Sequence, residues 1–216
     1  MNFEFLLLIG ALVTGFAWVT QRFITPASKV HKILKEVGSY FFVLLLVFGV
    51  RSFMYEPFRI PSGSMKPVFV EGDFILIDKY SHGFRWPISH KRISKHQPER
   101  GDIVVFKGDV RGNEAYVIKR VIGLPGDHVQ YKKKQLYLNG KKVPKTFLNE
   151  EQDQDVEAGI DYPALRYQEV LGDKTYDIYN YPFVSPEGYP YDDVIVPPGK
   201  YFVMGNNRDN SNDARY

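Results

Sequence analysis

The sequence predicts a mainly β protein that follows an N-terminal two-helix membrane anchor. Long apolar runs occur only before residue 58, whereas the chain after residue 60 carries short apolar runs separated by glycine, proline and asparagine turns. The proline-bounded stretch Arg59–Pro67 joins the two regions. We therefore expect an anchor at 1–58, a β-rich domain at 59–148 and 193–216, and an inserted lobe at 149–192.

Two apolar runs indicate membrane spans at about 4–22 and 37–55. A cleavable signal peptide is the alternative for the first run, but it needs a basic start, and Glu4 is the only charge before the run. A buried helix of a soluble protein is the alternative for the second run, whose apolar core, Val37–Val50, is short. We favour two uncleaved spans.

The segment 20–36 between the spans is basic and predicts the orientation of the anchor. It carries Arg22, Lys29, Lys32 and Lys35 against the single acid Glu36. Short basic loops stay in the cytoplasm by the positive-inside rule. We therefore expect a multi-pass protein of the inner (cytoplasmic) membrane, with everything after Tyr55 on the periplasmic side.

Composition excludes several function classes. The 216 residues contain no cysteine, which rules out a thiol nucleophile, a disulfide framework and a cysteine-ligated metal. The net charge of +3 is too small to indicate a nucleic-acid partner, and Lys132–Lys134 is expected to be a solvated hairpin edge. No metal-binding motif occurs. We expect no cofactor, no metal and no nucleic acid.

The region after residue 70 is expected to form short strands. Asn139-Gly140 is the strongest hairpin signal. Residues 149–192 begin with an acidic run and continue as a tyrosine- and proline-rich excursion that we expect to be partly mobile. The expected strands are Phe74–Ile77, Ile103–Phe106, Tyr116–Ile122, Leu136–Leu138, Lys174–Tyr179, and a strand, turn and strand over Val194–Met204.

Ser64 is the candidate nucleophile. It lies in a turn that Pro61 and Pro67 make rigid and that Gly63 allows to bend tightly. The alternative is an ordinary serine-bearing turn at the start of a domain. Histidine is the usual base for such a serine. His31 lies in the cytoplasmic segment, and the sequence places no orienting acid beside His82, His90, His96 or His128.

Lysine is the other candidate base. Lys119 lies within an apolar strand, where alternation places it on one face with Val117 and Val121. An apolar site disfavours the charged amine, and lowering its pKa from ~10.4 towards ~8 costs about 3 kcal/mol. The alternative is a snorkelling lysine on an edge strand. Lys66 is a rival base that we expect to stay solvated and charged.

These motifs together resemble the bacterial type I signal peptidase (leader peptidase) family, in the Gram-negative type with two transmembrane spans. Pro61–Pro67 resembles the nucleophile motif of the family, and Lys119–Asp127 its general-base motif. Gly72-Asp73 and Arg100–Phe106 match its strand motifs, and Gly205–Arg215 its last motif. The motifs occur in the order of the family and cover most of the chain outside 149–192.

The resemblance implies a signal-peptidase-like β-fold and a catalytic Ser–Lys dyad. Ser64 would attack the scissile carbonyl, Lys119 would take its proton, and Ser211 would orient the amine. Ser62 would help the backbone N–H of Ser64 to form the oxyanion hole. Three further residues would support this geometry: Asp213, Arg215 and Arg120. The substrates would be exported preproteins with small residues at −1 and −3 of the cleavage site.

Three positions depart from the pattern of the family. Asn206 stands where aspartate is frequent, so a supporting ion pair is expected to be lost, and Ala214 stands where serine is usual. The sequence ends at Tyr216, where family members continue into a further strand. Two other functions remain open: a Ser–Lys self-cleaving regulator, which the spans argue against, and a membrane-anchored β-scaffold that binds extended peptides without catalysis.

Overall fold

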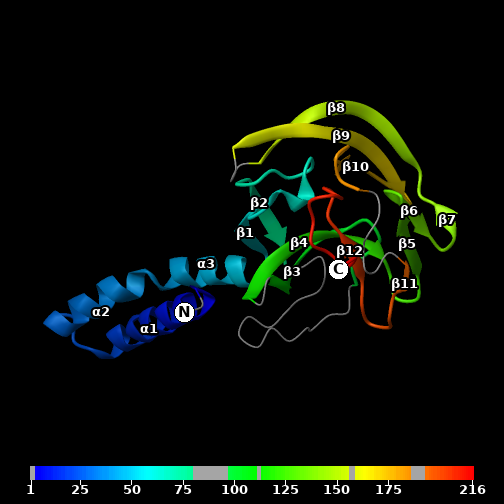
Figure 1. Ribbon diagram of the computed structural model, residues 1–216. Helices are drawn as coiled ribbons and strands as arrows, with labels where there is room; N and C mark the ends of the chain where they lie inside the picture. Colours follow the sequence, from blue (N-terminus) through cyan, green and yellow to red (C-terminus); the bar gives the residue numbers. More distant parts are fainter. Residues whose placement is uncertain (1–2, 80–96, 111–112, 156–158, 186–192) are drawn as a thin grey trace. The chain divides into compact units, whose positions relative to one another are not determined.

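A computed structural model describes the chain except residues 1–2, 80–96, 111–112, 156–158 and 186–192. The chain divides into two compact units. One contains Met1–Phe58 and Leu76–Gln97, and the other Arg59–Ile75 and Pro98–Tyr216. The described residues of the first unit are mainly helical and those of the second mainly β, which confirms the predicted fold class (Figure 1).

The first unit holds α1 (Phe3–Thr20), a 3-10 turn, α2 (Lys29–Ser39) and α3 (Phe41–Phe53). The stretches Phe5–Phe23 and Lys29–Phe53 are each long and apolar enough to cross a membrane. Figure 1 shows α1 lying alongside α2 and α3.

Glycine permits the close approach of these helices. A Cβ on Gly38 would lie 2.8 Å from the Cα of Trp18, and a Cβ on Gly15 would lie 2.8 Å from the ring of Phe41. Larger residues at either position would push α1 away from its neighbours.

The basic segment between the apolar runs differs from the expected loop. Helix α2 begins at Lys29, so Lys29, Lys32 and Lys35 lie on a helix. The Ser28 hydroxyl caps this helix by accepting a hydrogen bond from the N–H of Val30. Apolar residues at 30, 33, 34 and 37 follow with helical spacing. The cap and this spacing explain why the segment is helical.

The described strands form four small sheets. One is the pair β1–β2, and the three others have the orders β12-β4-β3, β11-β5-β6-β7 and β10-β9-β8. Strand pairing in these three sheets is antiparallel. The bounds are β1 Tyr55–Arg59, β2 Phe74–Asp78, β3 Ile103–Val110, β4 Asn113–Gly123, β5 His128–Lys132, β6 Gln135–Leu138, β7 Lys141–Lys142, β8 Lys145–Asp155, β9 Ile160–Leu171, β10 Lys174–Asn180, β11 Asp193–Ile195 and β12 Phe202–Met204.

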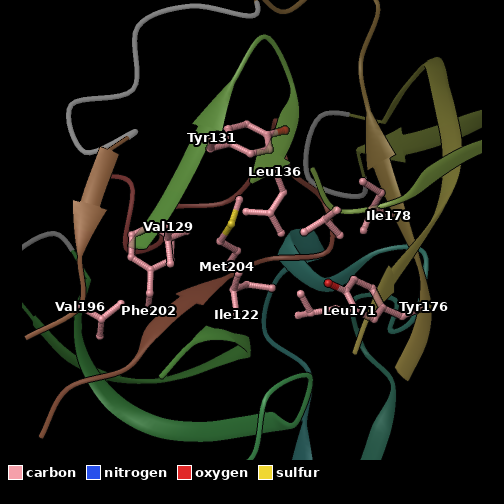
Figure 2. Packing of buried hydrophobic residues seen from close by; sticks show 11 residues of the cluster. Ile122, Val129, Tyr131, Leu136, Leu171, Tyr176, Ile178, Val196, Phe202 and Met204 are labelled. Carbon is pink, nitrogen blue, oxygen red and sulfur yellow. The ribbon is translucent and has the colours of Figure 1, made fainter. Parts of the chain in front are cut away.

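One hydrophobic core joins these three sheets. Met204 of β12 lies among side chains of β4, β5, β6, β9 and β10 (Figure 2). Met204, Ile122 and Leu136 are fully buried. Burying a side chain of this size contributes about 1.5–3 kcal/mol, so this cluster fixes how the three sheets pack.

The described residues of the segment 149–192 are more regular than the sequence indicates. Strands β8, β9 and β10 form a three-stranded sheet in which β8 and β9 make a long curved ribbon (Figure 1). The acidic run at 150–155 belongs to β8 because cross-strand partners compensate it. Arg166 Nη1 of β9 lies 2.8 Å from Glu151 Oε1, and Arg166 also pairs with Asp177 of β10. At the other end of the ribbon, Leu171 belongs to the main core.

Candidate active site

The Ser64 turn is held at both ends by the backbone. Ile60 donates to the carbonyl of Asp73 and accepts from Gly72, which fixes the start of the turn. Ser62 is extended, and Gly63–Met65 form one 3-10 turn. The Lys66–Pro67 peptide is cis. The carbonyl of Ser64 accepts a hydrogen bond of 3.0 Å from the N–H of Asn207. Backbone contacts therefore hold the serine in place.

Lys119 comes from the middle strand of its sheet. Strand β4 pairs with β3 on one side, where Lys119 faces Val104, and with β12 on the other, where Arg120 faces Met204. Lys119 is 4% exposed, and its Nζ lies 2.7 Å from Oγ of Ser64. The edge-strand alternative is therefore wrong, because β4 is central and the lysine does not reach solvent.

The surroundings of Lys119 favour its neutral form. Burial lowers its pKa from 10.5 to about 8, while the charge of Asp213 raises the pKa and that of Arg215 lowers it further. The neutral amine is thus well populated near pH 8. An amine in that form can accept the proton of the Ser64 hydroxyl.

Ser62 and Ser211 both lie near Ser64, with different contacts. The Ser62 hydroxyl donates to Oγ of Ser64 over 3.3 Å. Ser211 is 8% exposed, and no hydrogen bond among the described residues joins its hydroxyl to Lys119. A Cβ on Gly205 would lie 2.3 Å from Oγ of Ser211 and 2.4 Å from the carbonyl oxygen of Ser64. Glycine is therefore required between these two residues.

Asp213 and Arg215 form a buried ion pair behind this loop. Arg215 Nε donates to Oδ1 of Asp213 over 2.8 Å, and Nη2 donates to Oδ2 over 2.9 Å. Asp213 also accepts from the N–H of Gly205, and Arg215 donates to the carbonyl of Arg208. Burial alone would raise the pKa of Asp213, but Arg215 outweighs it and the pKa lies below its usual value. The carboxylate is therefore charged beside Lys119.

Arg120 contacts Asn206, the position at which the resemblance led us to expect aspartate. Its Nε donates to Oδ1 of Asn206 over 3.0 Å, and its Nη1 donates to the carbonyl of Gly101. The amide of Asn206 donates in turn to the carbonyl of Asp177. Asparagine thus keeps the hydrogen bond to Arg120 and binds β10 as well. Ala214 packs against the main core.

Residues 33–216 match the family described as signal peptidase, peptidase S26. The chain belongs to this signal peptidase family. Membership of this family indicates that the chain is a peptidase that takes part in signal-peptide removal.

Three signal peptidase I relatives show how far the similarity extends. The relative from Pseudomonas fluorescens is 44% identical over 203 residues, which are 92% of this chain and 69% of the relative. The Pseudomonas aeruginosa relative is 44% identical over 88% of this chain and 66% of its own length. The relative from Buchnera aphidicola is 34% identical over 97% and 85%. The chain thus spans about two thirds of the length of the Pseudomonas relatives.

A crystal structure of a signal peptidase I from Enterococcus faecalis is 27% identical and covers 56% of this chain and 86% of its own. Its TM-score is 0.30, too low for the superposition to support an argument.

Lys66 corrects one expectation. It is not solvated but 7% exposed, and its Nζ lies 2.7 Å from Oδ1 of Asp153 and 2.6 Å from the carbonyl of Gln154. Its partner lies 87 positions away in the sequence, so no local pattern indicates the pair. The proline-bounded turn around Lys66 suggested an exposed side chain, but contact with β8 removes it from water.

A second buried ion pair near the site has no local signal either. Arg208 and Glu169 are 1% and 0% exposed, and Nη1 of Arg208 lies 2.9 Å from Oε1 of Glu169. Arg208 Nε also donates to the carbonyl of Gly205. Glu169 thereby ties β9 to the loop that carries Ser211. The ion pair with Arg208 explains why a glutamate is present at this buried position of β9.

Lys134 and His128 also differ from expectation. Lys134 is not a solvated edge, because its Nζ lies 2.7 Å from Oδ2 of Asp209 and its side chain is 16% exposed. His128 does have an acid beside it, since its Nε2 lies 2.6 Å from Oδ1 of Asp193 on the neighbouring strand β11. Ser64 nevertheless meets Lys119 rather than this histidine.

One other histidine, His31, lies within the described residues. His31 contacts the carbonyl of Gln21 in the helical unit. Three further histidines, His82, His90 and His96, lie outside the described residues. Where the chain is described, no group of three or more His, Asp or Glu side chains is placed to hold a metal ion.

Proposed function

We propose that the chain is a membrane-anchored serine endopeptidase that removes signal peptides from exported preproteins, with Ser64 as nucleophile and Lys119 as general base. One observation carries the proposal. The hydroxyl of Ser64 lies 2.7 Å from the amine of a buried lysine whose pKa is lowered to about 8. A nucleophile within hydrogen-bond reach of such a base is the arrangement that acyl transfer requires.

In the first half-reaction, Oγ of Ser64 attacks the scissile carbonyl carbon while its proton passes to neutral Lys119. The resulting ammonium gives that proton to the leaving amine, the C–N bond breaks, and an acyl-enzyme remains. In the second half-reaction, Lys119 takes a proton from water, and the hydroxide formed attacks the ester. Collapse of this second intermediate returns the proton to Ser64.

The negative oxygen of each tetrahedral intermediate needs hydrogen-bond donors. The N–H of Ser64 lies in the first turn of a short 3-10 helix, Gly63–Met65, where backbone donors lack a helical acceptor. We assign this N–H and the Ser62 hydroxyl to the oxyanion hole, where one donor contributes about 3 kcal/mol. Ser211 is the residue proposed to orient Lys119, and the pair of Asp213 with Arg215 holds the loop on which Ser211 lies.

The substrate proposal follows from the family. An extended peptide with small side chains at −1 and −3 would bring its scissile carbonyl to Ser64, with alternate side chains turned towards the enzyme. The direct contact between Ser64 and Lys119 counts against a binding scaffold in which the serine has no chemical role.

The anchor supports a membrane location. Its two long apolar helical stretches expose large side chains, among them Phe16 at 72% and Leu46 at 68%. Lipid would cover these side chains. Basic residues between the stretches favour a cytoplasmic connection, which places the β unit on the periplasmic side of the inner membrane.

The test is cleavage of a signal-peptide-bearing preprotein by the full chain in detergent. We expect one cut at the signal junction, and none with Ser64→Ala of the same expression level and the same circular dichroism. Cleavage that survives Ser64→Ala would overturn the proposal. Binding of the preprotein without cleavage by the unaltered chain would favour the scaffold.

A further inference from the structure

The Lys66–Asp153 ion pair connects the Ser64 turn to the acidic strand β8. Lys66 is the second residue after Ser64, and its Nζ lies 2.7 Å from Oδ1 of Asp153. The two side chains are 9% and 6% exposed. The carbonyl of Gln154 accepts a second hydrogen bond of 2.6 Å from the same amine. The only strand that the sequence indicated within 149–192 was Lys174–Tyr179. The contact with Lys66 shows that β8 also lies beside the turn that carries Ser64.

A second path returns from Asp153 to Ser64 itself. The hydroxyl of Tyr181 donates to Oδ2 of Asp153 over 2.5 Å. The amide of Asn207 donates to the Tyr181 hydroxyl over 2.6 Å, and its backbone N–H donates to the carbonyl of Ser64 over 3.0 Å. The contacts form a closed ring that begins and ends at the nucleophile turn.

Aromatic packing fixes the side chain of Tyr181 within this closed set of contacts. The rings of Tyr181 and Phe183 are stacked with centroids 5.3 Å apart, and Tyr162 meets Tyr181 edge-on at 5.2 Å. Tyr162 belongs to β9, so the ribbon supports the phenol from behind. A tyrosine held in this way can fix the carboxylate of Asp153.

The stem of Lys66 also covers the turn directly. A Cβ on Gly63 would lie 3.2 Å from Cε and 3.4 Å from Cδ of Lys66. The side chain therefore folds back over the residue before Ser64 while its amine reaches β8. Loss of the amine's partners would release this cover.

We propose that the ribbon β8–β9 is a clamp on the nucleophile turn, and that Lys66 and Asp153 are positioning residues that hold Ser64 at its distance from Lys119. This inference rests on the proposed function of Ser64. A buried ion pair is weak evidence of a gain in stability, because well-packed apolar residues often replace one without loss. Precise geometry at a nucleophile is a benefit that such a replacement does not supply.

The clamp acts by position rather than by charge. The charges that shift the pKa of Lys119 are those of Asp213 and Arg215. Removal of the Lys66 amine should therefore leave the ionisation of the base unchanged while it loosens the nucleophile. This separation gives the proposal a signature that general destabilisation does not share.

The experiment compares Lys66→Met, Asp153→Asn, their double variant and the conservative Lys66→Arg in the full chain in detergent. The substrate is a synthetic peptide that spans a signal-peptide junction. We expect Lys66→Met to lower kcat by about tenfold to a hundredfold with KM within about twofold, because small displacements of a reacting group have effects of this size. The double variant should be no worse than Lys66→Met, and Lys66→Arg should recover most of kcat.

The matched control is Arg100→Met. Arg100 binds the carbonyl of Ile122 and the carboxylate of Asp127, at a distance of 2.7 Å from the latter, so its loss removes an ion pair of the same length, though less buried, from the same unit. We expect it to leave kcat within about threefold of the unaltered chain. Equal loss of kcat in Arg100→Met and Lys66→Met would overturn the clamp.

Two further readouts complete the test. The pH at half-maximal kcat/KM should be the same in Lys66→Met as in the unaltered chain, and amide hydrogen exchange should rise in peptides covering 59–75 but not in those of β5 and β6. Unchanged kcat or unchanged exchange at 59–75 would overturn the clamp. If the unaltered chain does not cleave at all, the proposed function fails, and hydrogen exchange alone then decides the clamp.

Discussion

Two lysines of the β unit, Lys119 and Lys145, have the same shift of pKa but different partners. Burial is the main cause in both, and each pKa falls from 10.5 to about 8. Lys119 meets the hydroxyl of Ser64 at 2.7 Å. The amine of Lys145 instead donates to the carbonyl of Lys134 and to Oδ1 of Asn180, and lies 4.1 Å from the centre of the Tyr167 ring.

The comparison shows that a lowered pKa does not by itself identify a general base. Burial makes a neutral amine available in both regions, but a reaction also needs a proton donor that can become a nucleophile. Carbonyl and amide oxygens have no proton to give. The partner of Lys119, rather than its pKa, distinguishes it from Lys145.

The largest expected effect separates the two lysines by activity. Lys119→Met should lower kcat/KM for a preprotein by about 10²–10⁴-fold, whereas Lys145→Met should stay within about threefold. Ser64→Ala should match Lys119→Met, and the double variant should be no worse than either, because both residues act in one proton transfer. Equal losses of kcat/KM in Lys119→Met and Lys145→Met would contradict the conclusion that the partner of Lys119 distinguishes it from Lys145.

The second prediction concerns stability. Burial of charged Lys119 costs free energy below pH 8, and this cost is relieved as the pH rises from about 8 to 10.5, where the unfolded chain still binds the proton. Lys119→Met should therefore raise the free energy of unfolding at neutral pH by up to ~3 kcal/mol. The gain should disappear near pH 10.5.

Denaturation of both variants in detergent at several pH values measures this effect. Lys145→Met should gain less than Lys119→Met, because it also loses two hydrogen bonds and a ring contact. If Lys119→Met has a lower free energy of unfolding than the unaltered chain at neutral pH, burial of Lys119 does not destabilise the fold.

The sequence was informative where the signal is local. The turn at Asn139-Gly140 has positive φ at both residues, as such a hairpin requires, and the alternation around Lys119 correctly indicated a strand. Short apolar runs likewise predicted β2, β3, β6 and β12. The same local patterns singled out Ser64 and Lys119 as candidates, although they do not indicate the contact between them.

The sequence was uninformative where a contact is long-range. Asp153 and Glu169 are buried because each pairs with a cation distant in the sequence, Lys66 and Arg208 respectively. The backbone of the turn between β5 and β6 is also unusual, since Lys133 and Lys134 both have positive φ without glycine. Lys134 is fixed there by Asp209 rather than by its own conformational preference.

The third prediction tests whether the activity depends on the position of Ser64, the partner of Lys119. Gly205→Ala would place a Cβ 2.4 Å from the carbonyl oxygen of Ser64 and 2.3 Å from Oγ of Ser211. The displacement should lower kcat by about tenfold to a hundredfold. The pKa of Lys145, followed by the pH dependence of its reaction with an amine reagent, should not change. Full activity of Gly205→Ala would contradict the tight contact at this loop.

The smallest expected effect is a shift in pH dependence. The charge of Asp213 raises the pKa of Lys119, so Asp213→Asn should lower that pKa further and move the rise of kcat/KM to a lower pH. We expect a shift of less than about one pH unit, because Asp213 is a secondary influence beside burial. A shift to higher pH would contradict the assignment of Lys119 as a neutral base.

The most direct test of the account is the pH dependence of kcat/KM, which reports the ionisation of the free enzyme. Because the neutral amine is the active form, kcat/KM for a junction peptide should rise with pH to a plateau, with its midpoint at about 8. Lys145→Met should show the same midpoint. Activity that is already maximal below about pH 6, or a midpoint that moves in Lys145→Met, would show that Lys119 is not the base.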